Sequence, residues 1–285
     1  MAQRTAITDE WVAAAASSRP FGVAGNWGAA SGIVVQPPAR GGLFRRASRQ
    51  AAAPAVALVA PQWPGLPESD RAALVDDALC AGLLRGGVAV ARVTALDFAG
   101  PADVGAWIDA IADAFAAISA DAPRAGLAGS WFAGTACAVL AGRLPSLAFL
   151  ACAGSPSAEV MGRRTPENED DPVWETSPTL RLADALAALA PLEAVTVHAR
   201  PALFVQGAVG EPIGAEHLEA WRAALAATGR PADAVEIAFA DALFVPVAAP
   251  GDEAGEPDGG RALLAAAVAS WAERAFSRPA VRRGR

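Results

Sequence analysis

Lysine and tyrosine are absent from the 285-residue sequence, histidine occurs only twice, and cysteine only three times. Because lysine is absent, arginine supplies every basic side chain, and the formal net charge is −7. An acidic chain of this kind is unsuited to broad nucleic-acid binding, which depends on neutralising many phosphates. The arginine-only usage and the excess of alanine are typical of a high-GC, bacterial-type genome rather than of a particular function.

The few cysteines do not form a framework. They lie within apolar runs, are odd in number and lack the paired spacing of a metal site or a disulfide scaffold; they are Cys80, Cys137 and Cys152. We expect three reduced residues of the core. The acidic run 167–171 contains no histidine, so we interpret it as a solvated loop and predict no metal and no cofactor.

The sequence also shows no pattern typical of a secretory signal or of a membrane-spanning segment. Residues 1–19 contain an alanine run, but Asp9 and Glu10 precede it and no long apolar stretch follows, which argues against a secretory signal. Nowhere do about 18 uninterrupted apolar residues occur. These absences predict a soluble, cytoplasmic protein without a membrane span.

What the sequence does contain is a regular alternation of strand and helix patterns, with 53% hydrophobic residues to form a core. After one or two edge strands within 21–36, strands are expected at 55–60, 88–93, 126–129, 147–152, 202–206 and 234–239. Helices are expected at 68–84, 102–118, 135–142, 179–189, 216–227 and 261–276. This alternation predicts an α/β fold with a doubly wound, mostly parallel sheet flanked by helices.

The economical domain description is one unit spanning 1–285. An irregular stretch interrupts the alternation, and we interpret 155–190 as a small cap insertion. Residues 277–285 are arginine-rich and predicted to be a flexible tail.

The most informative loop is segment 129–134, GSWFAG, which follows a strand and opens a helix. It resembles the nucleophile elbow of the α/β-hydrolase superfamily, where the reactive residue occupies a strained turn and small residues are needed two places before and after it. With Trp131 at the apex, Gly129 and Ala133 fill the crowded positions. With Ser130 at the apex, Phe132 would press against the strand-to-helix crossing. The resemblance therefore places Trp131 where the family carries its nucleophile.

The other two catalytic positions of the family also differ. Segment 201–207 resembles the family's penultimate strand, and the acid position after it falls on Gly210, with Glu211 one residue away. The histidine position after the last strand falls on Ala242. No histidine follows His217, and the second one, His198, precedes a strand at the far end of the sheet. Catalysis of this kind needs an imidazole to move the serine proton.

Since three positions differ together, the sequence predicts a pseudoenzyme whose match to the superfamily covers roughly residues 55–275. The C-terminal half is similar to dienelactone-hydrolase and serine-peptidase-like members. Two roles remain open: binding of an apolar or acyl-type small molecule, or contact with a protein partner. The alternative is an active serine ester or acyl hydrolase with Ser130 as nucleophile and Glu211 or Asp241 as base. That alternative requires a positive φ at Ser130 and a carboxylate within hydrogen-bond reach.

A pocket, if present, is expected at the carboxyl ends of the strands. The family's oxyanion loop corresponds to segment 61–65, PQWPG, where two prolines remove two backbone donors. The predicted pocket-lining residues are Gln62, Trp63, Ser130, Trp131, Phe132 and Trp174.

Overall fold

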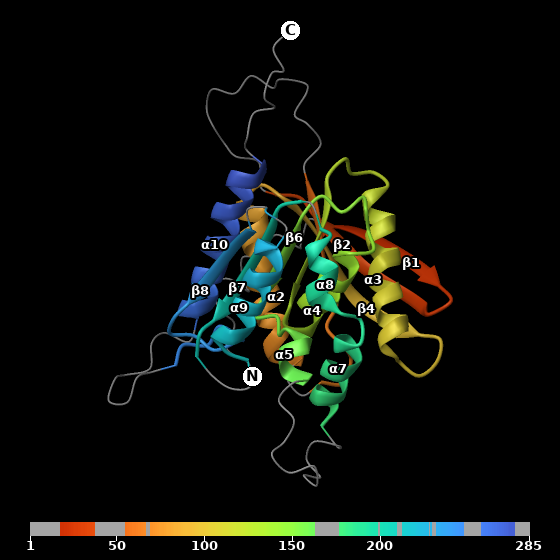
Figure 1. Ribbon diagram of the computed structural model, residues 1–285. Coiled ribbons are helices and arrows are strands. Elements are labelled where there is room, and N and C mark those ends of the chain that lie inside the picture. The colour runs from red at the N-terminus through yellow and green to blue at the C-terminus, as the bar shows by residue number, and fades with distance from the viewer. Residues whose placement is uncertain are drawn as a thin grey trace, which may run out of the picture.

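The computed structural model describes residues 18–37, 55–66, 69–162, 177–198, 200–209, 213–227, 229, 232–247 and 258–276. Its centre is a single twisted sheet with helices on both faces (Figure 1). The strands are β1 (Arg19–Gly25), β2 (Gly28–Val35), β3 (Val56–Val59), β4 (Ala89–Phe98), β5 (Ala125–Ser130), β6 (Leu150–Ala153), β7 (Ala202–Gly207) and β8 (Ala232–Ile237). The helices are α2 (Ser69–Arg85), α3 (Val104–Ser119), α4 (Trp131–Ala141), α5 (Ala158–Gly162), α7 (Pro178–Ala187), α8 (Pro191–Thr196), α9 (Ala215–Ala226) and α10 (Gly259–Phe276).

The eight strands follow the order β1-β2-β4-β3-β5-β6-β7-β8. β2 is antiparallel to both of its neighbours, whereas all pairs from β4 to β8 are parallel. The predicted mostly parallel, doubly wound α/β architecture is therefore confirmed. Parallel order brings the carboxyl ends of β3, β5, β6, β7 and β8 to one edge of the sheet, and the loops that follow them meet there.

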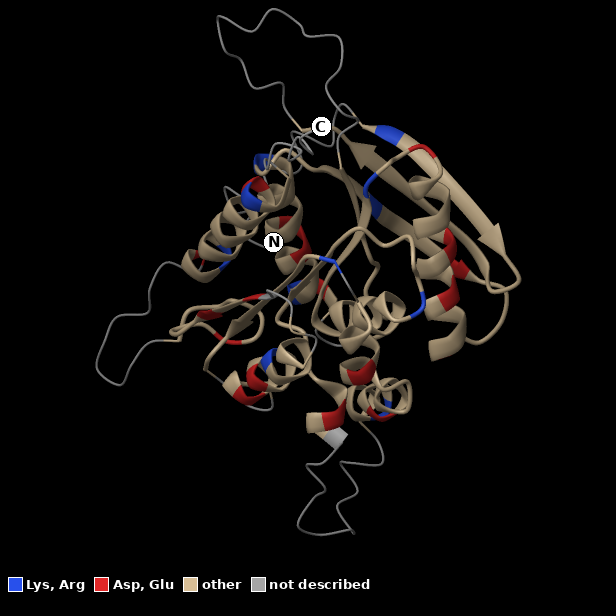
Figure 2. Ribbon diagram, turned by 45° about the horizontal axis from the view of Figure 1, so that its top comes forward, with Lys and Arg blue, Asp and Glu red and all other residues tan. Residues whose placement is uncertain are grey.

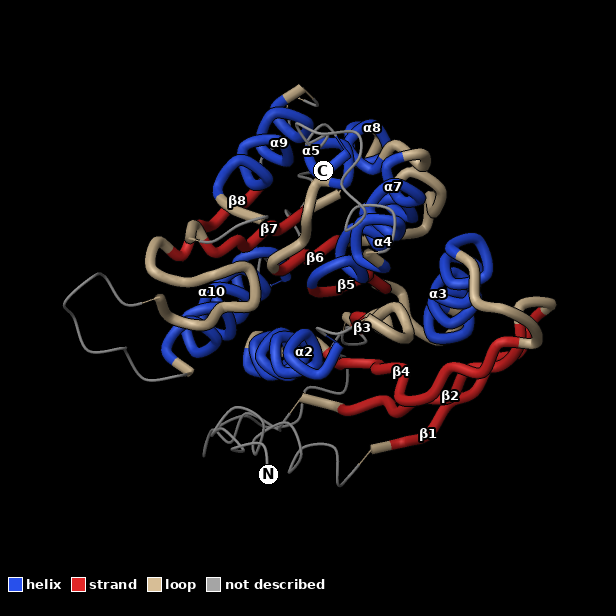
Figure 3. Tube along the Cα trace, turned by 90° about the horizontal axis from the view of Figure 1, so that it is seen from below, coloured by secondary structure: helices blue, strands red, loops and turns tan. Residues whose placement is uncertain are grey.

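Helices cover both faces because the inner strands are apolar on both sides. α2 and α10 pack side by side against one face, and α3, α4 and α9 cover the other (Figure 3). Charged residues are interspersed over the outer helices (Figure 2). Strands β3, β5, β6 and β7 contain no charged residue, and Arg92 of β4 is a basic group close to the core.

Several predicted boundaries were wrong, and the reasons are physical. α4 begins at Trp131, four residues before the expected start, because every residue of this helix is buried and no amphipathic stripe marks it. β4 continues to Phe98 because its second half pairs with the beginning of β2 in an antiparallel ribbon. The short helices α5 and α8 were not predicted, since five or six residues give too little periodicity to detect.

The predicted cap range 155–190 contains α5 and α7, while residues 163–176 lie outside the described residues, as does the predicted tail 277–285. Within the part of the chain that is described, no helix combines the length and the apolar character needed to cross a membrane.

Candidate functional site

The turn between β5 and α4 has the geometry of a strand-to-helix elbow. Ser130 ends the strand with φ −111° and ψ 162°, and Trp131 begins the helix with φ 52°. A positive φ is unfavourable for a bulky side chain and costs on the order of 1–3 kcal/mol, so the surrounding packing must hold it. The strained position of the elbow is thus Trp131, and the positive φ that an active Ser130 would require lies one residue further on.

Two close approaches explain why this elbow needs small residues. A β-carbon added at Gly129 would lie 2.8 Å from the backbone carbon of Ala133 and from the backbone nitrogen of Gly134. One added at Gly134 would lie 1.8 Å from Ser155 Oγ, in the loop after β6. The helix therefore crosses the strand too closely for any larger side chain at either glycine.

Trp131 is almost enclosed, with 7% of its surface exposed. Its ring meets Phe132 edge to face, with centroids 5.6 Å apart. The indole nitrogen Nε1 is buried, yet it finds no acceptor among the described residues. A buried donor without a partner costs on the order of 1–3 kcal/mol.

The Ser130 side chain belongs to a buried polar cluster that we call the Asp76 cluster. Ser130 Oγ donates to Asp76 Oδ1 at 2.6 Å, and Gln62 Nε2 donates to Ser130 Oγ at 3.0 Å and to Asp76 Oδ2 at 3.1 Å. Ser130 has 0% exposed surface and Asp76 has 3%. Among the described residues, the carboxylate that Ser130 contacts is therefore Asp76 of α2, whereas the Asp241 carboxylate accepts backbone N–H groups of its own turn.

A second carboxylate extends this cluster toward β4. Asp77 forms an ion pair with the guanidinium of Arg92, and the side chains keep 11% and 18% exposure, respectively. Arg92 also donates to the carbonyl oxygen of Ala73 at 3.5 Å. Arg92 is thus the cation that balances the two neighbouring acids on α2.

Burial raises the pKa of Asp76 from 3.8 to about 6, and the Arg92 charge together with the hydrogen bonds from Ser130 and Gln62 opposes part of that rise. Burial likewise raises the pKa of the Cys80 and Cys137 thiols, which keeps them protonated and unreactive. The sequence analysis missed Asp76. The available signal was its spacing, since it lies four residues from Ala72 and Cys80 on the apolar face of α2.

We expect Asp76 to make the protein less stable as pH rises from about 4 to about 6. Below about pH 4 the carboxyl group is protonated in both states and contributes nothing; between the two pKa values only the unfolded chain is ionised, so the native state loses up to about 3 kcal/mol. Urea unfolding across this range should therefore show Asp76→Asn gaining stability relative to wild type as pH rises. Asp70→Asn, on the exposed first turn of α2, is the matched control substitution. An Asp76→Asn difference that stays constant would contradict the raised pKa.

Two sets of side-chain contacts hold the loop after β3 in place. Gln62 joins the Asp76 cluster, and Trp63 packs edge to face on Trp107, with centroids 5.4 Å apart. Trp107 Nε1 in turn donates to the carbonyl oxygen of Pro61 at 3.1 Å. Of the predicted pocket-lining residues, the structure joins Gln62 to Ser130 by hydrogen bonds. Trp174 lies outside the described residues.

The loop after β8 contains Ala242, and it packs on the ends of β6 and β7. A β-carbon at Gly154 would lie 1.9 Å from the carbonyl oxygen of Ala242, and one at Gly207 would lie 2.0 Å from that of Asp241. Asp241 Oδ1 accepts the backbone N–H groups of Leu243 at 2.8 Å and Val245 at 2.9 Å. The Asp241 carboxylate therefore stabilises its own turn. Gly210 and Glu211, the candidates for the acid, lie outside the described residues.

Both histidines are buried and lie away from the elbow apex in sequence. His217, on α9, has 0% exposure, and its Nδ1 accepts the backbone N–H of Ser157 at 2.9 Å. That bond places the ring proton on Nε2, which lies 3.8 Å from Glu216 Oε1. His198 follows α8 and is 5% exposed. Across the described residues, no group of three or more histidine, cysteine or acidic side chains is arranged to hold a metal ion.

No protein-family model matches the sequence, and a search of curated proteins finds no significant relative. Solved structures, however, match nearly the whole chain. The esterase domain of a Rhodothermus marinus protein matches with a TM-score of 0.58 and 18% identity, covering 90% of this chain and 98% of that one. A lidless α/β serine hydrolase from Xanthomonas campestris gives 0.59 and 16%, covering 92% and 97%. An esterase from Pyrobaculum calidifontis gives 0.58 and 18%, covering 93% and 89%.

These structural matches establish the fold. Because the sequence identities are below 20%, they do not transfer an activity to this chain. The chain has the α/β-hydrolase fold, as the strand order and these structures together show. Its elbow apex is a tryptophan.

Proposed function

We propose that this protein is a non-catalytic α/β-hydrolase-fold protein that binds a small acyl-type molecule at the former catalytic edge instead of hydrolysing it. The observation that carries the proposal is Trp131 at φ 52° on the elbow between β5 and α4. An indole has one N–H donor and no oxygen or sulfur nucleophile. With this residue at the apex, the apex position offers no nucleophile to attack an ester carbonyl.

The surrounding groups support the loss of catalysis. The loop after β8 holds Ala242 where a proton-transferring imidazole would be needed, and His217 uses Nδ1 to accept a backbone N–H. With Ala242 at that position, the loop after β8 supplies no imidazole to deprotonate a hydroxyl or to protonate a leaving group. Three buried free cysteines also fit a reducing, cytoplasmic setting.

The buried indole N–H of Trp131 supports a binding role for this edge. It is enclosed by protein, has no acceptor among the described residues, and would regain a hydrogen bond from a carbonyl or carboxylate oxygen of a ligand. Apolar surroundings such as Phe132 would favour the acyl chain. A protein partner at the same edge is the second role, and it is favoured if the indole fills the space completely.

One observation favours the alternative of an active hydrolase: Ser130 Oγ lies 2.6 Å from Asp76 Oδ1, and the pKa of Asp76 is raised to about 6. This pair has a nucleophile and a base in contact. Against it, Ser130 is fully buried with an extended backbone, so a substrate carbonyl could reach its oxygen only after the elbow rearranged.

The deciding experiment is labelling of the folded protein with a fluorophosphonate probe. We expect no labelling above that of Ser130→Ala, while an active α/β-hydrolase treated in parallel labels fully. The physical reason is that an activated, accessible hydroxyl is required for the probe to react. Specific labelling that disappears in Ser130→Ala and in Asp76→Asn would overturn the proposal in favour of an active serine hydrolase.

A further inference from the structure

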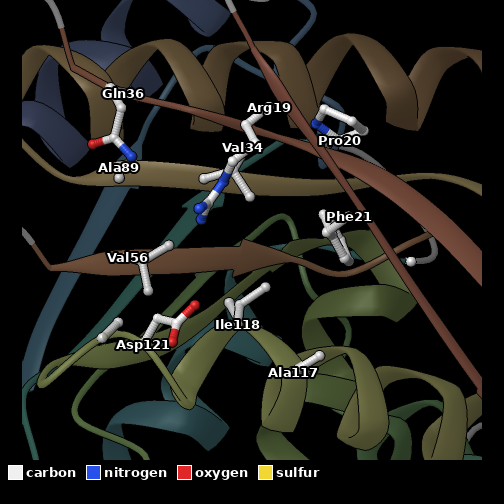
Figure 4. Close-up of a pocket in the computed structure, with 12 residues that line it drawn as sticks. Arg19, Pro20, Phe21, Val34, Gln36, Val56, Ala89, Ala117, Ile118 and Asp121 are labelled. Atoms are coloured by element: carbon white, nitrogen blue, oxygen red, sulfur yellow. The ribbon is translucent and has the colours of Figure 1, made fainter.

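A second candidate site lies at the opposite edge of the sheet, at the amino ends of the strands. There the structure has a cavity of about 540 Å³, within the range of small-molecule sites (Figure 4). The beginnings of β1, β3 and β4, the end of the antiparallel strand β2 and the end of α3 surround it. Trp131 follows the carboxyl end of β5, so this cavity is separate from the former catalytic edge.

The floor of the cavity is apolar and the rim is polar. Val34, Val56 and Ala89 form the floor and are buried, with exposures of 7%, 6% and 2%. Phe21 and Ile118 are half-buried and stand on two sides of the space (Figure 4). The floor therefore offers an apolar surface that an aliphatic or aromatic body can cover.

Two opposite charges flank this floor. Arg19 projects into the cavity from the start of β1, and Asp121 points into it from the segment after α3 (Figure 4). Both residues are exposed, and within the described chain neither forms a hydrogen bond or an ion pair through its side chain. Asp121 also lies just beyond the end of α3, whose last carbonyl groups add negative potential.

We propose that this cavity binds a small zwitterion of the amino-acid class, with a carboxylate on Arg19, an ammonium group on Asp121 and an apolar body on the floor. A planar guanidinium matches a carboxylate in a bidentate geometry. The ammonium group is stabilised by both the Asp121 carboxylate and the carbonyl end of α3. A purely anionic or purely cationic ligand would leave one of the two charges without its partner.

The test uses L-phenylalanine as probe, with 3-phenylpropionate and phenethylamine as partial probes that keep the ring but lack one charge. Titration calorimetry of the full chain should show saturable binding of L-phenylalanine that is about ten-fold or more tighter than that of either partial probe. Arg19→Gln and Asp121→Asn should each remove that advantage. Both side chains are exposed, so the urea midpoint of each variant should equal that of wild type.

Arg124→Gln is the matched control, because Arg124 is an exposed arginine of the loop after α3 that does not line this cavity. It should bind L-phenylalanine as wild type does. Absence of saturable binding, equal affinity for 3-phenylpropionate, or an equal loss in Arg124→Gln would each overturn the proposal. Trp131 variants should leave this binding unchanged, which separates its outcome from that of the proposed function.

Discussion

Replacing Arg92 with methionine is expected to lower the free energy of unfolding by about 3 kcal/mol, the lower end of the cost of breaking a buried ion pair. Arg92 pairs with Asp77 and lowers the otherwise larger rise in the pKa of Asp76. Without the guanidinium, two neighbouring acids on α2 remain near the core with no cation. The midpoint temperature of thermal unfolding should fall by roughly 5 °C for a chain of this size.

The control for this prediction removes the orphaned charge as well. Arg92→Met combined with Asp77→Leu should recover much of the lost stability, since similar-sized apolar residues can replace a buried ion pair at little cost. An Arg92→Met variant as stable as wild type would mean that the pair is solvated and contributes nothing. In that case Arg92 would also do little to oppose the rise in the pKa of Asp76 that burial causes.

The combined substitution Trp131→Ser and Ala242→His is expected to raise fluorophosphonate labelling about 100-fold or more over Trp131→Ser alone. The apex serine supplies a hydroxyl on the strained turn, and the histidine supplies the base at the family's position on the loop after β8. General-base assistance typically contributes about 10²–10⁴-fold. Labelling rates measured by intensity against time would give the ratio.

Two controls make this result specific. Ser130→Ala in the same background should leave the gain intact, because the neighbouring serine faces the Asp76 cluster. Phe132→Ser in place of Trp131→Ser should gain nothing, since Phe132 lies within the helix beyond the apex. A gain that depends on Ser130 would show that the elbow turns on Ser130 instead.

Much of the fold was predictable because it depends on local periodicity. Alternating strand and helix patterns at 55–60, 68–84 and 88–93 correspond to β3, α2 and β4, and they already imply a parallel sheet. The beginning of α4 was predicted four residues too far along the chain, because a helix buried on all sides has no polar face to define where it begins.

For the candidate site, the resemblance to the α/β-hydrolase elbow identified the segment around Trp131, and steric crowding within that segment chose Trp131 as its apex. The predicted apex is the residue with φ 52°, and the register was chosen because it places the small residues Gly129 and Ala133 at the two crowded positions. Sequence reasoning did not find Asp76 or Arg92. They lie 54 and 38 positions from Ser130, and nothing local indicates that one helix and one strand bring them together with the elbow.

The sequence by itself determined the layer architecture and the scarcity of histidine, since both follow from residue type and local spacing, and the resemblance to the α/β-hydrolase superfamily located the elbow. Only the tertiary structure decided that Ser130 points at a buried Asp76, that the Trp131 indole N–H lacks an acceptor among the described residues, and that Arg19 and Asp121 face one cavity. These depend on contacts between residues far apart in the chain, which are set by how the helices pack on the sheet and are not encoded in any short pattern.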